Sequence, residues 1–305
     1  MKKNLIYLLI DITLIFILVF IFIYSNDIKE SVLIAINIWN NSLIPSIFPF
    51  LLLSNLLVKY GFIEIISKIF GRATEIIYNL PKSASYAIIT SMFTGFPTGS
   101  KYIKDLLQNR EIDNEDANVL ITFTSFSNPL FVISAVGEGM LHNKKIGIKI
   151  FMVHLFTGLF VGLLFKKKKE RKNIQVNKKV INNKSFIENL INSINETFKI
   201  LANILGLLIF FFIIVTIINK ILPNNLITLL LKGLIEITTG INYIAKSKIQ
   251  IKMKAALIGL LLSFNGLSIH FQTKSIIENT DIKYENYLIS RTIHALLCFI
   301  ILLFF

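Results

Sequence analysis

The stretch Thr94-Gly95-Phe96-Pro97-Thr98-Gly99-Ser100-Lys101 interrupts a long apolar region with two glycines, a proline, three hydroxyls and a cation. A second polar break, Thr122-Phe123-Thr124-Ser125-Phe126-Ser127-Asn128-Pro129, interrupts the next apolar region. Lipid cannot supply hydrogen bonds to backbone that leaves a helix, so such backbone must be buried in protein or line a watery cavity. The two breaks therefore predict a polar cavity at membrane depth.

The composition is typical of an integral membrane protein. The 305 residues are 54% hydrophobic and 16% charged, with a mean hydropathy of +0.67, whereas soluble domains carry about 25% charged residues. Continuously apolar runs such as residues 204–218 favour helical spans over the alternating strands of a β-barrel. We expect an all-α, polytopic integral membrane protein with about eight spans, some of them broken or re-entrant.

The net charge of +14 is best explained by topology, because Lys and Arg hold loops in the cytoplasm. Residues 166–184 carry nine Lys or Arg and one Glu, which indicates a cytoplasmic linker. The basic residues have no aromatic residues between them, so we expect no nucleic-acid partner. A single cysteine, Cys298, excludes an intramolecular disulfide, and the four scattered histidines predict no metal site. No motif indicates a cofactor.

The linker divides the chain into two halves. We predict an uncleaved N-terminal membrane anchor at residues 1–30, a first membrane repeat at 31–165, the basic linker at 166–190 and a second membrane repeat at 191–305. Thr94-Gly95-Phe96-Pro97 aligns with Asn265-Gly266-Leu267-Ser268, since an apolar run precedes each and a charged segment follows. Glu75 aligns with Glu236, although an insertion is then needed. Paired interruptions in two halves indicate an inverted repeat and the site of a secondary transporter.

The residues around the breaks are the predicted solute site. A half-helix that begins near Ser100 or Lys101 would present free N–H groups and the positive end of its dipole to an anion. The alternative is that the same residues are helix caps and small-residue packing contacts. The predicted substrate-binding residues are Thr94, Gly95, Pro97, Thr98, Gly99, Ser100, Lys101, Ser127, Asn128, Asn265, Ser268 and Gln272.

Two carboxylates are candidates for ion coupling. A charge at the centre of a bilayer costs at least ~2.5 kcal/mol, so Glu236 in an apolar segment predicts a function. The alternative for Glu236 is that its segment lies near the membrane interface, with Lys232 one helical turn away. The same alternative applies to Glu75, which has Arg72 nearby. No hydrolytic or phosphate-binding motif occurs, so we expect no enzyme and no catalytic residues.

The two breaks, with Gly137 and His142-Asn143 after them, resemble a family of sporulation integral membrane proteins in the nucleoside-recognition, or Gate, domain group. The similarity runs from about Leu43 to the end, and Glu236-Ile-Thr-Thr-Gly240 and Gly266-Leu-Ser268 look like the family's second-half motifs. The resemblance implies a role in spore maturation. It implies a transporter in the outer forespore membrane, derived from the mother cell, that moves dipicolinic acid, a planar aromatic dianion.

Two other functions stay open at this point. The same breaks suit a nucleoside-type solute carrier, and the chain can also be a non-transporting membrane partner in spore assembly. The expected partners are the lipid bilayer and a small anionic solute, with other sporulation membrane proteins or a second copy of the chain as further candidates.

Overall fold

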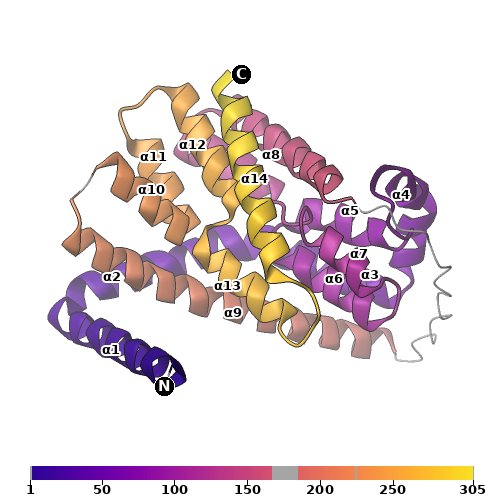
Figure 1. The fold of residues 1–305 in the computed structure, drawn as a ribbon, viewed down its shortest axis with the longest axis horizontal. Helices are drawn as coiled ribbons and strands as arrows, with labels where there is room; N and C mark the ends of the chain where they lie inside the picture. Colours follow the sequence, from indigo (N-terminus) through magenta and orange to yellow (C-terminus); the bar gives the residue numbers. More distant parts are fainter. Residues whose placement is uncertain (1, 167–184, 224, 305) are drawn as a thin grey trace.

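The computed structural model describes residues 2–166, 185–223 and 225–304, and these form helices and no strand. The expectation of an all-α fold is confirmed for this part of the chain. The elements, labelled in Figure 1, are α1 (Lys2–Ile23), α2 (Ser25–Ile38), the π-helical turn η1 (Trp39–Leu43), α3 (Ile44–Lys59), α4 (Phe62–Tyr78), α5 (Ala84–Thr94), α6 (Thr98–Gln108), α7 (Asn114–Leu120), the π-helix η2 (Phe131–Met140), α8 (Lys144–Leu164), α9 (Phe186–Ile221), α10 (Leu226–Ile235), α11 (Ile237–Lys246), α12 (Ile251–Phe264), α13 (Gly266–Ile277) and α14 (Tyr284–Phe304).

Four segments are long and apolar enough to cross a membrane: α8, α9, the α12–α13 pair and α14. Two further pairs qualify when each bent pair is taken as one span, with bends of 100° between α1 and α2 and 96° between α3 and α4. The described residues therefore give four to six candidate spans, and the expected number of about eight is not confirmed.

The predicted domain boundaries fall at identifiable places. The N-terminal anchor, residues 1–30, contains α1 and the first turn of α2. The predicted linker, residues 166–190, lies outside the described residues at 167–184, and its end is helical because α9 begins at Phe186.

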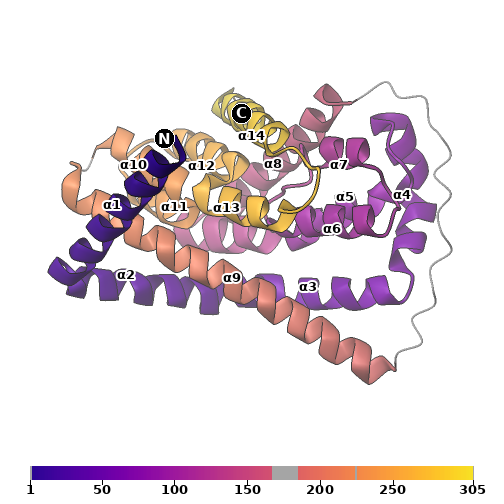
Figure 2. The same cartoon turned by 60° about the horizontal axis from the view of Figure 1, so that its bottom comes forward.

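Helix α9 runs along the molecule, and α2, η1 and α3 run alongside it in the opposite direction (Figures 1 and 2). Two hydrogen bonds join the helices: Trp39 Nε1 donates to the Leu201 carbonyl at 3.0 Å, and Asn55 Nδ2 donates to Thr197 Oγ1 at 3.2 Å. The rest of the second half, with η2 and α8, packs on one core, centred on α12 and α14. A second core lies among α3, α5, α6 and α7.

Besides the two bent pairs, four breaks between consecutive helices of the described chain matter for the candidate functional site. Gly95, with φ 78°, separates α5 from α6, and residues 121–130 separate α7 from η2. Glu236 is extended and separates α10 from α11, while Asn265, with φ 80°, separates α12 from α13. Three of the four breaks lie where the sequence predicts them. The break at Glu236 carries no glycine or proline, so its sequence gave no sign of it.

Close helix packing beside that break depends on two glycines. A Cβ atom added to Gly240 on α11 would lie 2.1 Å from the Cα atom of Gly233 on α10. Because the atom met is a backbone atom and not the end of a flexible side chain, it cannot move aside at little cost. Gly206 on α9 is different, because a Cβ atom there meets nothing within 4 Å.

These two glycines give a matched prediction. Gly240→Ala should lower the free energy of unfolding by about 1–3 kcal/mol, as overpacking does elsewhere. Gly206→Ala should raise it by up to about 1 kcal/mol, because alanine is the better helix former. Thermal unfolding of the purified protein, followed by fluorescence of its one tryptophan, measures both. Equal midpoints for the Gly240→Ala and wild-type proteins would contradict the close contact between α10 and α11.

Candidate functional site

The four breaks, two from each half of the chain, meet at one cavity of about 50 Å³. Its lining combines residues next to the breaks with residues of η1, α3 and α9. The polar part of its wall is Ser127, Asn128, Glu236, Thr238, Ser268 and Gln272. The apolar part is Leu43, Ile47, Phe96, Phe131, Ile204, Leu208, Ile237 and Ile269. We call this space the central cavity.

Several polar groups in this wall are available to a solute. The Ser127 hydroxyl is fully buried and has no hydrogen-bond partner among the described residues. Ser268 lies in the first turn of α13, and Gln272 follows one turn later on the same face. No side chain caps the N-terminus of α13, so its first N–H groups carry the positive end of the helix dipole to the cavity wall.

Glu236 is the one charged residue in the described wall of the central cavity. Its carboxylate caps α11, accepting hydrogen bonds from the Thr238 N–H at 3.1 Å and the Thr239 N–H at 2.6 Å. Lys232, one turn earlier, places its Nζ 5.3 Å from the ring centre of Tyr243. The helix terminus therefore provides stabilisation for the buried carboxylate.

Asn128 lines the cavity, and its side chain also forms hydrogen bonds that connect the first two breaks. Its Nδ2 donates to the Phe93 carbonyl at the end of α5, at 2.8 Å. Its Oδ1 accepts from the N–H of Leu130 at 2.8 Å and of Phe131 at 3.3 Å, at the start of η2. A Cβ atom on Gly95 would lie 2.7 Å from the Asn128 nitrogen, so only glycine lets the two breaks approach this closely.

The other residues of the first break are not in the cavity wall, apart from Phe96. Helix α6 begins at Thr98, earlier than the expected start near Ser100 or Lys101. Its first turn packs on the second break, since a Cβ atom on Gly99 would lie 2.0 Å from the Thr124 carbonyl oxygen. The remaining members are buried in local contacts: Thr94 and Thr98 share a hydrogen bond between their hydroxyls, Pro97 precedes α6 after a cis peptide bond, and Ser100 is 3% exposed.

Lys101 lies in a second space, a recess of about 330 Å³, and not in the central cavity. Its Nζ is 2.7 Å from Asp105 Oδ2 and 3.1 Å from Asn55 Oδ1. Burial lowers the pKa of Lys101, and the charge and hydrogen bond of Asp105 raise it, so the pKa lies above its ordinary value. Lys101 is therefore a protonated, paired cation.

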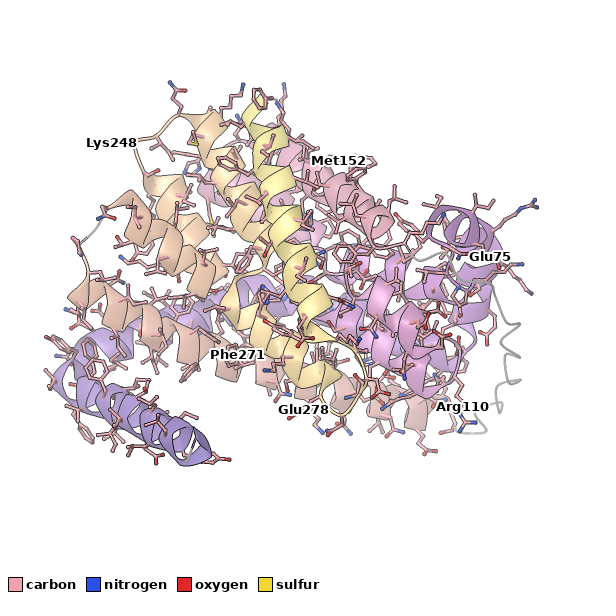
Figure 3. The ribbon with its side chains drawn as sticks, in the orientation of Figure 1. Glu75, Arg110, Met152, Lys248, Phe271 and Glu278 are labelled. Atoms are coloured by element: carbon pink, nitrogen blue, oxygen red, sulfur yellow. The ribbon has the colours of Figure 1, made fainter. Side chains whose placement is uncertain are left out.

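Asn265 and Glu75 also lie outside the cavity wall. Asn265 Nδ2 donates to Ser125 Oγ at 2.7 Å and to the Tyr287 hydroxyl at 2.9 Å. Glu75 lies on α4 near the edge of the molecule (Figure 3), with its Oε2 atom 3.9 Å from Lys82 Nζ. Of the predicted residues, the structure thus brings Ser127, Asn128, Ser268, Gln272 and Glu236 together at one cavity.

Arg291, which was not among the residues predicted from the sequence, lies behind the second break. Its side chain is fully buried. Nη1 donates to the Ser125 carbonyl at 3.1 Å, and Nη2 donates to the Thr122 carbonyl. The guanidinium thus satisfies two carbonyls of the second break, beyond the end of α7. An arginine in an apolar span is a signal that the sequence did contain.

Two histidines extend this network to the cavity. His154 Nε2 accepts from the Ser127 N–H at 3.0 Å, so Nδ1 carries the proton toward Ser263 Oγ at 2.9 Å. His294 Nε2 lies 2.8 Å from the His154 carbonyl and so carries a proton, while its Nδ1 accepts from Arg291 at 2.9 Å. Each ring therefore has one donor and one acceptor, which makes both imidazoles neutral. The spacing of Arg291 and His294, one helical turn apart, was visible in the sequence.

Comparison with known proteins agrees with this picture. The family model described as nucleoside recognition, or Gate, matches residues 42–144, which include the first two breaks. The sporulation integral membrane protein YlbJ of Bacillus subtilis (strain 168) is 24% identical over 298 residues, covering 86% of this chain and 73% of that protein. No solved structure matches. The predicted resemblance is confirmed: residues 42–144 match the nucleoside-recognition, or Gate, family, and the chain, an integral membrane protein, is similar to a sporulation integral membrane protein.

Proposed function

We propose that the chain is a carrier, not an enzyme, and that it moves a small aromatic dicarboxylate, dipicolinate, across the membrane through the central cavity. The observation that carries the proposal is the convergence of four breaks from both halves of the chain on one cavity that holds an unpartnered hydroxyl. Interrupted helices with free polar groups at a midplane site are typical of secondary transporters.

The wall of the cavity supports an anionic solute. Ser127, Ser268 and Gln272 supply donors, and the uncapped start of α13 adds N–H groups and positive potential. The Glu236 carboxylate would repel a dianion, so we propose that the solute binds when this carboxylate is protonated. Glu236 then couples proton binding to solute binding. For Glu75 the salt bridge to Lys82 supports a surface role rather than coupling.

The central cavity is small in the described conformation. A volume of about 50 Å³ is far below that of pockets which enclose drug-sized ligands, about 300–1,000 Å³. The helices around the cavity must therefore separate to admit the solute and close again around it, as alternating access requires.

We infer that the two halves are an internal repeat. Gly95 and Asn265 both follow an apolar helix with a positive φ, of 78° and 80°, and the next helix begins within three residues. Each half contributes two breaks to the cavity.

The similarity to the sporulation protein of Bacillus subtilis supports a proposal for the place of action. We propose that the chain works during spore formation, in the outer forespore membrane derived from the mother cell. There a dipicolinate carrier would supply the developing spore.

A nucleoside-type carrier is the second candidate, and one observation favours it. No lysine or arginine is present in the described wall of the cavity, whereas hydroxyls, amides and a carboxylate are. Such groups suit a neutral solute that carries hydroxyls. The description of the matching family, nucleoside recognition, points the same way.

The first test measures uptake by proteoliposomes that contain the purified protein alone. We expect dipicolinate uptake, and we expect Ser127→Ala to lower its rate about tenfold or more, since a hydrogen bond to a charged group is worth about 1.5–3 kcal/mol. Thr292→Ala is the matched control, because this hydroxyl is exposed and bonds within α14.

The outcomes separate the candidate functions. Uptake of a nucleoside such as uridine in place of dipicolinate would favour the second candidate. Uptake of neither solute, by protein that is folded and inserted, would favour a non-transporting partner in spore assembly.

The second test concerns proton coupling at Glu236. Protonation removes a negative charge beside the dianion, so wild-type uptake should rise as the pH falls from about pH 8 to about pH 6. Glu236→Gln should abolish this dependence, because the amide cannot titrate. Glu75→Gln, on the surface of α4, should keep it. Equal pH profiles for the wild-type and Glu236→Gln proteins would remove Glu236 from coupling.

A further inference from the structure

The recess that holds Lys101 is lined by more cations than anions. Its charged and amide residues are Asn55, Lys59, Lys101, Asp105, Glu196 and Lys199. Lys101 pairs with Asp105 at 2.7 Å, and Lys59 lies 3.5 Å from Glu196. The three lysines exceed the two carboxylates, so the recess is a region of net positive charge within the described chain. We call it the lysine recess.

The lysine recess lies at the end of the apolar part of α9. Residues 200–218 of α9 carry no charge, and 19 residues of helix approach the thickness of the hydrocarbon region, about 30 Å. Glu196 and Lys199 come just before this part, whereas Ile204 and Leu208 of the central cavity lie within it. At 1.5 Å per residue, Glu196 and Lys199 lie about 8–12 Å along α9 from Ile204, on the side where the charged part of the helix begins.

Both spaces lie along the same helix pair. Helices α3 and α9 run antiparallel, as three pairs of residues show. Ile47 and Ile204 share the central cavity, Asn55 bonds Thr197, and Lys59 Nζ donates to Ser193 Oγ at 3.0 Å. The recess and the cavity are therefore successive spaces on one interface.

Two leucines occupy the position between them. In the antiparallel register, Leu51 falls between Ile47 and Asn55, and Leu201 falls between Thr197 and Ile204. Both side chains are fully buried and belong to the same core. The register therefore places both leucines in the interval between the lysine recess and the central cavity.

We propose that the lysine recess is an outer binding site for small carboxylate or sulfonate anions, and that the Leu51–Leu201 pair is the barrier between it and the central cavity. The identity of the transported solute rests on the proposed function. The path from the lysine recess past the two leucines to the central cavity does not. The recess lies near the start of α9, just after the linker that the sequence predicts to be cytoplasmic, so anions reach it from that side.

The ion pairs of the recess suit exchange with a solute. The carboxylates are the more exposed partners, with side-chain exposures of 33% for Asp105 and 48% for Glu196 against 20% for Lys101 and 17% for Lys59. Because both carboxylates are partly open to solvent, a solute anion can reach the lysines and replace either carboxylate as their partner. Asp105 and Glu196 act as internal counter-ions while the recess is empty of solute.

Thiol labelling tests the path without any transport assay. In a Cys298→Ala background, Ile204→Cys places a thiol in the wall of the central cavity. The probes are an anionic sulfonatoethyl and a cationic trimethylammonioethyl methanethiosulfonate. We expect Lys59→Gln with Lys101→Gln to slow the anionic probe about fivefold or more and to leave the cationic probe unslowed, because the local potential attracts anions. The control is Val215→Cys on α9, in a core away from the cavity.

The barrier has its own expected result. Leu51→Ala or Leu201→Ala should raise the labelling rate of Ile204→Cys with both probes about tenfold, because each removes packing that opposes opening. The milder Leu51→Val serves if the alanine variants do not fold.

Unchanged rates in the leucine variants, or a charge preference that the lysine variants do not alter, would overturn the proposal even if dipicolinate is transported. Conversely, if labelling gives the expected rates but dipicolinate is not taken up, the proposed path stands and the proposed solute is wrong.

Discussion

The structure depends on satisfying backbone that leaves helical geometry in the apolar interior. Helix α7 ends at Leu120, and an unpaired carbonyl beyond it would cost about 1–3 kcal/mol. Arg291 meets this need, because one guanidinium donates to the carbonyls of both Thr122 and Ser125. Only arginine offers several donors in a fixed planar fork. Its buried charge is in turn stabilised by those carbonyl dipoles and by the ring of Tyr287, 5.8 Å from the guanidinium carbon.

This constraint explains which polar groups remain for a solute. His294 accepts from Arg291 and donates to the His154 carbonyl, and His154 accepts from the Ser127 N–H. The backbone of Ser127 is therefore satisfied from behind, and its hydroxyl is left without a partner at the cavity. The side chain of Asn128, its neighbour, is in contrast fully engaged: its Nδ2 donates to the Phe93 carbonyl, and its Oδ1 accepts from the Leu130 N–H. The polar residues of a break thus divide into those that hold it in place and those that face the cavity.

The sequence predicted the breaks better than it predicted the cavity wall. Glycine, proline and hydroxyl residues mark three breaks in apolar runs, and buried Glu236 stands out because a carboxylate is costly there. The wall depends on where each helix begins: α6 starts at Thr98, and Lys101 then faces Asn55 on α3. The support behind the breaks is harder to predict, since Arg291 reaches a carbonyl 169 residues earlier in the chain. No local pattern contains that pairing, although an arginine in an apolar span signals that a partner must exist.

For the proposed carrier, the separation of charges along α3 and α9 has a physical purpose. A lysine inside the buried central cavity would pair with a carboxylate in a low dielectric, where the attraction is strong and release is slow. Hydroxyls, an amide and a helix N-terminus hold an anion more weakly, and conduction requires a site that a solute can leave. The cations are instead at the lysine recess, near water, where they raise the local concentration of anions without trapping them. In the proposed path, attraction and release therefore occur at different depths, and the buried Leu51–Leu201 pair separates them.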